Sequence, residues 1–363
     1  MIDRSLLKNT DWILIALLLL NSGIGVAFIH SSSHYLPTNY ALKQTFWILA
    51  GLVTLMIFLS INYQTLVTYA FVLYGMFLFV LAGILLFGRM TAGTKSWIVL
   101  PFFHIQPSEL GKIVLVLVLA KVFAEHKADA LSFGHGVLGG LIVGAPMMLV
   151  AFQPDLGTAL TYLPILLAAF FLAGLRRKSL ILLLLVALLV GILGWNVFLK
   201  DYQKQRIMTL VSPGKDPRGA GYHMLQSKIA IGSGGLLGKG YKKGTQSQLR
   251  FLPARHTDFI FSVIGEEFGF FGVMAALFLY FLLLARLFQS VAKARDRAGV
   301  YIVFMVSVMI AFQFLANVLM TIGLFPIAGI PLPLLSYGGS SLLTHYLAVG
   351  LVLNVKMRRF VYV

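Results

Sequence analysis

Long apolar runs, each long enough to cross a lipid bilayer, constrain this chain more than any other feature of its sequence. A membrane-spanning helix needs about 20 mostly apolar residues. Such runs occur at 11–30, 41–60, 67–88, 109–124, 136–152, 157–174, 179–199, 259–288, 299–322 and 338–356. The apolar residues are continuous rather than alternating, which excludes a membrane β-barrel. We therefore predict an all-α, polytopic membrane protein with about ten transmembrane helices, in one integral membrane domain that covers residues 1–363.

The composition agrees with a membrane protein and narrows its partners. The chain is 59% hydrophobic and only 11% charged, whereas soluble proteins have about 25% charged residues. Its net charge of +17 predicts contact with anionic lipid headgroups or an anionic substrate. So little soluble surface makes nucleic acid a poor partner. The absence of cysteine excludes disulfides and thiolate metal sites.

The basic residues predict the orientation of the chain in the membrane. Short cytoplasmic loops carry an excess of Lys and Arg, and here these residues concentrate at 176–178, 286–297 and 356–359. We therefore expect both termini to be cytoplasmic and the long loop 200–258 to be extracytoplasmic. The first apolar run lacks a small-residue cleavage site, so we interpret it as an uncleaved helix rather than a signal peptide.

A basic, glycine-rich segment at the end of that long loop interrupts the apolar pattern. Glycine lets backbone N–H groups approach an anion closely, and lysine supplies positive charge. The segment therefore favours a diphosphate site that includes Lys239, Lys242 and Lys243. The spacing is not that of a nucleotide-binding P-loop. The alternative is a flexible basic loop that contacts anionic headgroups.

Asp258 lies where the basic loop enters the eighth apolar run. Burial raises the pKa of such a carboxyl, and a neighbour such as Arg255 lowers it. A carboxylate at this boundary suits a general base that accepts a proton from a hydroxyl. His256 is the histidine that we place near this chemistry. The alternative is that Thr257 or Asp258 merely caps the helix.

Further charged residues occur at the predicted outer ends of the helices. Glu109 and Lys112 are three residues apart and share one helix face, and Asp155 begins another helix. Ionisable groups within a membrane pair with each other and face internal cavities, so we expect these three to line a polar pocket. The alternative is a structural ion pair. For the adjacent Glu266 and Glu267, which point about 100° apart on a helix, we favour a structural role.

The segment 325–341 is apolar but rich in proline and glycine. Irregular backbone at membrane depth lines cavities rather than facing lipid. We therefore expect Ser336 and Tyr337 to offer hydrogen bonds to a sugar. A tight outer hairpin is the alternative.

Several of these segments together resemble one known family. They are QPSELGK, QPDLGT, DYQKQR, GAGYHMLQSKIAIGSGGLLGKG, GTQSQLRFLPARHTDFIF, GEEFG and GIPLPLLSYGGSS, in this order between residues 106 and 341. They resemble the shape, elongation, division and sporulation (SEDS) family of bacterial cell-wall polymerases. SKIAIGSGG, GKG and GTQS are more similar to the elongation members than to the division members.

The resemblance implies a peptidoglycan glycosyltransferase that polymerises lipid II at the outer face of the bacterial cytoplasmic membrane. It implies Asp258 as the catalytic residue, Glu109, Lys112 and Asp155 as cavity residues, and a class B penicillin-binding protein as partner. It names no cofactor, and a requirement for a divalent cation stays open. One departure is Ala254, where the family commonly has an acid.

Two other functions remain as alternatives. A lipid flippase or transporter would need charged residues through the full depth of the bundle, whereas here they gather at the outer helix ends. A scaffold that only recruits a transpeptidase would leave Asp258 and the basic loop unexplained. The chain's one-sided polar residues therefore favour the polymerase.

Overall fold

The computed structural model describes residues 9–88, 90, 94–100, 103–125, 133–174, 181, 201–212 and 219–360. This part of the chain is almost wholly helical, as the apolar runs predicted. The exception is a two-stranded antiparallel hairpin of β1 (Ile98–Val99) and β2 (His104–Ile105). The hairpin leads directly into the helix that carries Glu109.

The long helices follow the predicted runs closely. The first half of the chain forms α2 (Trp12–Ser33), α3 (Tyr40–Ser60), α4 (Tyr63–Thr68), α5 (Ala70–Phe87), α6 (Pro107–Glu125), α7 (Phe133–Phe152), α8 (Leu156–Leu160) and α9 (Leu163–Leu172). The second half forms α11 (Asp201–Val211), α12 (Ala220–Ser233), α13 (Thr245–Gln248), α14 (Ile260–Val291), α15 (Arg297–Thr321), α16 (Gly339–Met357) and the short 3₁₀ helix η3 (Arg358–Phe360). Helices α11, α12 and α13 instead lie in the loop between two of those runs. The predicted span 179–199 lies outside the described residues, apart from Ile181.

The predicted span 157–174 is helical over Leu156–Leu172 but is interrupted by a turn after Leu160. It forms α8 and α9, separated by a tight turn in which the Thr161 and Tyr162 N–H groups donate to the Thr158 and Ala159 carbonyls. Pro164 lies at the second position of α9. Proline has no N–H group and is tolerated only in the first turn of a helix, so it favours a new helix start here.

Six helices in the described part of the chain are long and apolar enough to cross a membrane: α2, α3, α5, α7, α14 and α15. Helices α6 and α16 carry more polar residues, but both are buried along most of their length. Neighbouring helices therefore shield their polar groups from lipid, as polar groups at membrane depth require.

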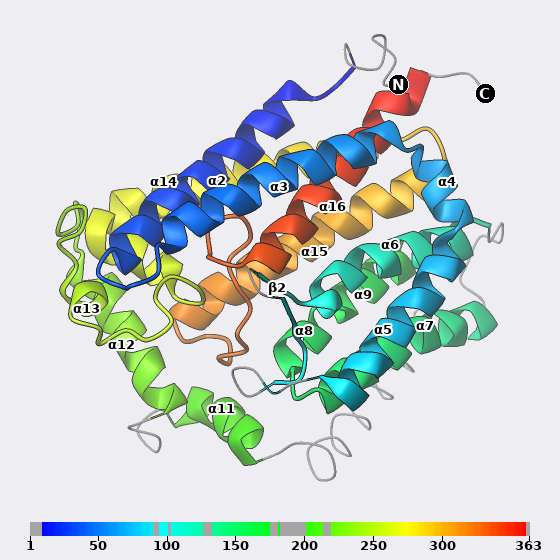
Figure 1. Cartoon of the computed structure of the whole chain (residues 1–363). Helices are drawn as coiled ribbons and strands as arrows, with labels where there is room; N and C mark the ends of the chain where they lie inside the picture. The colour runs from blue at the N-terminus through cyan, green and yellow to red at the C-terminus, as the bar shows by residue number, and fades with distance from the viewer. Residues whose placement is uncertain are drawn as a thin grey trace.

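Figure 1 shows both chain termini at one end of the helical bundle and α11, α12 and α13 toward the other. Helix α16 packs against α3, α6 and α15, and α14 packs against α2, α12 and α15. The end of the bundle away from the termini therefore gathers the long loop, the start of α14 and the irregular segment before α16.

Candidate active site

A cavity of about 780 Å³ opens where α8, α11, the start of α14 and the segment before α16 meet. Its walls come from parts of the chain that are far apart in sequence. The lining residues include Gln106, Glu109, Asp155, Thr158, Arg206, Thr257, Asp258, Ile327, Gly329, Tyr337 and Ser341. A cavity of this size, mostly apolar with a few convergent polar groups, is typical of a ligand site.

Four of the predicted site residues line this cavity: Glu109, Asp155, Asp258 and Tyr337. Two more lie close behind it, since Lys112 pairs with Glu109 and Ser336 bonds to the backbone beside Asp258. The remaining five are not among the lining residues: Lys239, Lys242, Lys243, Arg255 and His256.

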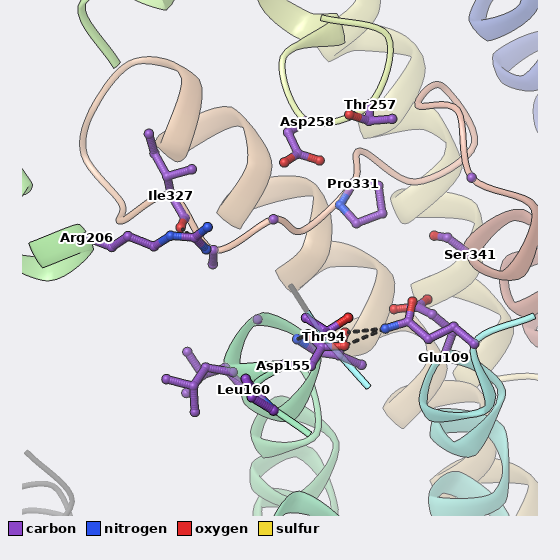
Figure 2. A pocket seen from close by; sticks show the side chains of 18 of the residues that line it. Thr94, Glu109, Asp155, Leu160, Arg206, Thr257, Asp258, Ile327, Pro331 and Ser341 are labelled. Carbon is purple, nitrogen blue, oxygen red and sulfur yellow. Dashed lines mark hydrogen bonds between the residues drawn. The ribbon is translucent and has the colours of Figure 1, made fainter. Parts of the chain in front are cut away.

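Asp258 is held by its backbone, while its carboxylate points into the cavity (Figure 2). The Asp258 carbonyl accepts a hydrogen bond from Asn317 Nδ2 at 2.9 Å, and the Thr257 carbonyl accepts one from Ser336 Oγ at 2.5 Å. A methyl group built on Gly329 would lie 3.9 Å from Asp258 Oδ2. The carboxylate thus lies over the segment that precedes α16.

The surroundings of Asp258 raise its pKa to about 6, because burial disfavours the charged carboxylate. The positive charge of Arg206 and a hydrogen bond from the Thr257 side chain act in the opposite direction. A carboxyl with this pKa is largely ionised at neutral pH and still basic enough to accept a proton. Asp258 therefore meets the requirements of a general base.

Asp155 lies on the facing wall (Figure 2). Its carboxylate caps α8 by accepting the Thr158 N–H at 3.2 Å, and it accepts Gln106 Nε2 at 2.5 Å. Burial raises the pKa of Asp155, and the negative charge of Glu109 adds to that effect, while its bonds to Thr158 oppose it. Its hydrogen bonds hold this carboxylate in place, so Asp155 shapes the wall.

Glu109 and Lys112 form the ion pair that the sequence allowed, but Lys112 is not among the residues that line the cavity. Lys112 Nζ contacts Glu109 Oε1 at 2.7 Å, and both side chains are buried. Glu109 also lines the cavity, and its Oε2 has no hydrogen-bond partner within the described residues. The ion pair thus lies within α6, and one acceptor oxygen of Glu109 is left for a ligand or a water molecule.

Arg206 is a cavity residue that the sequence analysis did not single out. It projects from α11, its Nη1 donates to the Ile327 carbonyl at 3.3 Å, and it lowers the pKa of Asp258. Among the described residues that line the cavity, it is the one basic side chain. The sequence did offer one signal, because Arg206 ends DYQKQR, one of the segments that resemble the family, although it is one of many basic residues in the loop 200–258.

The segment 325–338 is irregular and lines the cavity, as its prolines and glycines predicted. A Cβ atom on Gly157 would lie only 1.9 Å from the Ala328 carbonyl oxygen, so α8 packs directly against this segment. The Tyr337 N–H donates to the His256 carbonyl at 2.9 Å. These contacts connect the segment to both walls of the cavity.

The glycine-rich segment 234–244 does not reach the cavity in the described structure. It packs against a break in α14 at Gly269, where φ is 61° and ψ is −154°. The break removes the helical bonds of the Glu266 and Glu267 carbonyls, and the Lys239 and Gly240 N–H groups replace them at 3.0 and 2.9 Å. A Cβ atom on Gly238 would lie 2.2 Å from the Glu267 carbonyl oxygen. Glycine is therefore needed here for close packing.

The lysines of that segment, which the sequence assigned to a diphosphate site, lie outside the cavity lining. Lys239 Nζ pairs with Glu266 Oε1 at 2.9 Å, and Lys242 Nζ lies 5.6 Å from the centre of the Tyr241 ring. Lys243 is exposed. The prediction that these three line the substrate pocket is thus not supported by their positions.

Arg255 and His256 support the Asp258 turn from outside the cavity lining. Arg255 Nε donates to the Ser32 carbonyl at 2.5 Å, and its guanidinium lies over the Tyr35 ring. The His256 ring contacts the rings of Tyr40 and Tyr337. Burial, with the charge of Arg255, lowers the pKa of His256 to about 4, so this imidazole is neutral near pH 7.

Among the described residues, no group of three or more His, Cys, Asp or Glu side chains is placed to hold a metal ion.

Comparison with known proteins identifies the family. Residues 11–360 match the family model of the FtsW, RodA and SpoVE proteins, described as cell cycle proteins. The chain belongs to this family, which is the SEDS family. It is 39% identical over 310 residues to the peptidoglycan glycosyltransferase MrdB of Escherichia coli K12, covering 85% of this chain and 83% of that protein. It is 33% identical over 428 residues to the peptidoglycan glycosyltransferase RodA of Treponema pallidum, covering 97% and 98%.

Solved structures share the SEDS fold. One belongs to a study of how a peptidoglycan synthase complex coordinates polymerization and crosslinking; its chain matches with a TM-score of 0.84 and 32% identity, over 97% of this chain and 98% of that one. The crystal structure of RodA from Thermus thermophilus matches with a TM-score of 0.72 and 30% identity, over 97% and 98%. This SEDS protein is therefore a multi-pass membrane protein and a RodA-like peptidoglycan glycosyltransferase, as its motifs indicated.

Proposed function

We propose that this SEDS protein polymerises lipid II into glycan strands at the outer face of the cytoplasmic membrane, with Asp258 as the general base. The observation that carries the proposal is the Asp258 carboxylate, which faces a cavity of about 780 Å³ and has a pKa raised to about 6. Helix α11, which carries the lining residue Arg206, lies toward the end of the bundle away from the start of α2 and the end of α16 (Figure 1).

The reaction needs one proton acceptor and one site for a developing anion. Asp258 takes the proton from the 4-hydroxyl of the acceptor sugar, and that oxygen attacks the anomeric carbon of the donor strand. The bond from this carbon to the undecaprenyl diphosphate breaks, and its electron pair leaves on the diphosphate oxygen. General-base assistance of this kind contributes about 10² to 10⁴ in rate.

Arg206 is the group that we assign to the diphosphate. It is the basic side chain of the described cavity lining, and it lies on the same side as Asp258. A guanidinium binds phosphate oxygens in a bidentate manner and stabilises charge that develops as the bond breaks. The lysines at 239, 242 and 243 are not among the lining residues, so Arg206 replaces them in this role.

Similarity to the relatives supports a partner and a cellular process. Similarity to a chain of a peptidoglycan synthase complex supports a complex with a transpeptidase, for which we propose a class B penicillin-binding protein. Similarity to RodA and MrdB favours elongation. FtsW proteins also match at 33–34% identity, so a division-type polymerase is the alternative within the family.

Polymerisation of purified lipid II by the wild type and Asp258→Asn tests the proposal, each with and without the class B partner. Glycan chains are separated on a gel. The matched control is Asp296→Asn, because Asp296 caps α15 by accepting the Gly299 N–H at 2.9 Å and is not among the residues that line the cavity. We expect glycan chains from the wild type and from Asp296→Asn. Asp258→Asn should form product about 10²- to 10⁴-fold more slowly.

Other outcomes would redirect the assignment. Equal chains from Asp258→Asn would move the base to Asp155 or Glu109, which line the same cavity. No chains from any variant, while a known polymerase works in the same assay, would favour the flippase. Transport of a labelled lipid II by the reconstituted protein would then establish that function.

A further inference from the structure

Two adjacent backbone carbonyls beside the proposed base depend on side chains from other parts of the chain. The Asp258 carbonyl is bound by Asn317 Nδ2 at 2.9 Å, and the Thr257 carbonyl by Ser336 Oγ at 2.5 Å. Asp258 lies in a turn just before α14, so its carbonyl is outside the regular hydrogen bonding of a helix or a strand. Buried backbone carbonyls need donors, and here side chains provide them.

Asn317 binds both segments at once. Asn317 lies near the end of α15, and its Nδ2 also donates to the Ile330 carbonyl at 2.8 Å. One amide nitrogen therefore joins the turn that carries Asp258 to the irregular segment that precedes α16. The Asn317 side chain is fully buried, so water cannot easily replace either bond.

Ser336 repeats this arrangement from the irregular segment itself. Its Oγ accepts the Leu332 N–H at 2.9 Å while it donates to the Thr257 carbonyl. The Ser336 carbonyl in turn accepts Gln44 Nε2 at 3.1 Å, which adds a connection to α3. Ser336 and Asn317 thus fix two successive residues of the turn from two directions.

We propose that Asn317 is a positioning residue of the polymerase, which together with Ser336 sets the direction and the depth of the Asp258 carboxylate in the cavity. The proposal rests on Asp258 being the general base. Asn317 does not touch the cavity itself, because it is absent from the described lining residues. It acts through the backbone of Asp258 and through the position of Ile330, next to the lining residue Gly329.

The bonds predict a specific effect on the reaction. Without them the turn and the segment 325–338 separate, and the carboxylate no longer meets the acceptor hydroxyl at the same distance. A displacement of about 1 Å in a reacting group costs roughly 10² in rate. Water would also reach the carboxylate, which lowers its pKa toward the ordinary value. Arg206 from α11, and Glu109 and Asp155 across the cavity, are the other charged groups that face this space.

The test compares Asn317→Leu with Asn354→Leu, using the full-length protein in its complex with the class B partner. Leucine is close in shape to asparagine and removes the amide. Asn354 is a matched control, because its Nδ2 also donates to two backbone carbonyls, those of Phe58 and Ile61, and its side chain is fully buried. It lies near the end of α16, beside the C-terminus. Melting temperatures, kcat, KM for lipid II and the pH dependence of kcat/KM are measured for each.

We expect Asn317→Leu to lower kcat by roughly 10- to 100-fold, with KM changed by less than about threefold. The acid limb of its kcat/KM profile against pH should move to lower pH by about half a unit or more. Asn354→Leu should lose a similar amount of thermal stability and keep the wild-type pH profile. Ser336→Ala, which removes the second bond, should shift the acid limb in the same direction and serves if Asn317→Leu does not fold.

The outcomes separate this proposal from the assignment of Asp258. Superimposable pH profiles and kcat values for Asn317→Leu, Ser336→Ala and Asn354→Leu would overturn the positioning role, even if Asp258→Asn is inactive. Full activity of Asp258→Asn would instead remove the general base, and the positioning role with it.

Discussion

Asp258 and Glu266 are carboxylates eight residues apart at the start of α14, and the structure treats them in opposite ways. Glu266 is fully buried and accepts bonds from Lys239 Nζ at 2.9 Å, the Gln246 N–H at 2.7 Å and the Ser247 N–H at 3.0 Å. Asp258 is held through its backbone carbonyl, while its carboxylate faces a cavity. The difference supports the proposal that Asp258, rather than Glu266, is the reacting acid.

A carboxylate whose lone pairs are all occupied by fixed donors has little capacity left for a substrate. Each bond to Glu266 stabilises its charged form and connects the glycine-rich segment to α14. Asp258 has the Thr257 side chain and the through-space charge of Arg206, and burial outweighs both. Basic residues of the long loop therefore have different roles. Lys239 stabilises the fold by pairing with Glu266, whereas Arg206 from α11 faces the cavity.

Replacing Arg206 should produce the largest change after that of Asp258. Arg206→Gln removes the positive charge from the cavity, and the loss of one group that stabilises a developing anion costs about 10² to 10³ in rate. Initial rates of lipid II polymerisation measure the effect. The control is Arg250→Gln, an exposed arginine of the same long loop. Equal rates for the two variants would show that the diphosphate lies away from Arg206.

The pH dependence of the wild type distinguishes the two carboxylates without any substitution. The pKa of Asp258 is raised to about 6, so the base is protonated, and inactive, as the pH falls through that value. The rate should decrease about tenfold for each pH unit below 6. His256 does not contribute in this range, because its pKa is lowered to about 4. A measured kcat/KM that stays constant from about pH 8 to about pH 5 would contradict the assignment.

Glu266→Gln should show the reverse pattern, with a loss of stability and little loss of activity per folded molecule. Glutamine keeps one acceptor oxygen but presents an NH₂ group where the carboxylate accepts backbone N–H groups. Leaving a buried partner unsatisfied costs about 1–3 kcal/mol. The melting temperature in detergent should fall for Glu266→Gln and stay near the wild-type value for Asp258→Asn. An unchanged melting temperature would mean that the segment 234–244 is held by its backbone bonds alone.

The sequence predicted the parts of this fold that depend on local composition. Apolar length located the described helices, and the prolines and glycines of 325–341 located an irregular cavity wall. The break between α8 and α9 was missed, although Pro164 is a local signal for a new helix start. Glu109 and Asp155 line one cavity together with Asp258, whereas Lys112 lies behind it; charged residues in a membrane protein face such internal spaces.

The remaining site residues depend on tertiary contacts that no local pattern encodes. Arg206 and Asp258 are 52 residues apart, and only the packing of α11 beside the segment 325–338 brings them to one cavity. The glycine-rich segment resembled an anion site because glycine, which has no Cβ, lets the backbone approach any partner closely. Here that partner is α14, which is broken at Gly269. The break is evident only from the positive φ of Gly269 in the structure.

The smallest effect is expected from the lysines that the sequence had assigned to the diphosphate. Lys242→Gln with Lys243→Gln removes two positive charges from the surface of the glycine-rich segment, where Lys243 is exposed and Lys242 is half-buried. Surface substitutions away from buried contacts change the free energy by about 0.5 kcal/mol or less, which corresponds to a rate change of about twofold. Polymerisation rates in matched lipid mixtures measure this, with Arg206→Gln as the reference. A loss as deep as that of Arg206→Gln would place the diphosphate at the segment 234–244 after all, because the fold itself would be intact. A loss that occurs only in membranes with anionic lipids would instead assign these lysines to headgroup contact, and Arg206 would keep its role in the cavity.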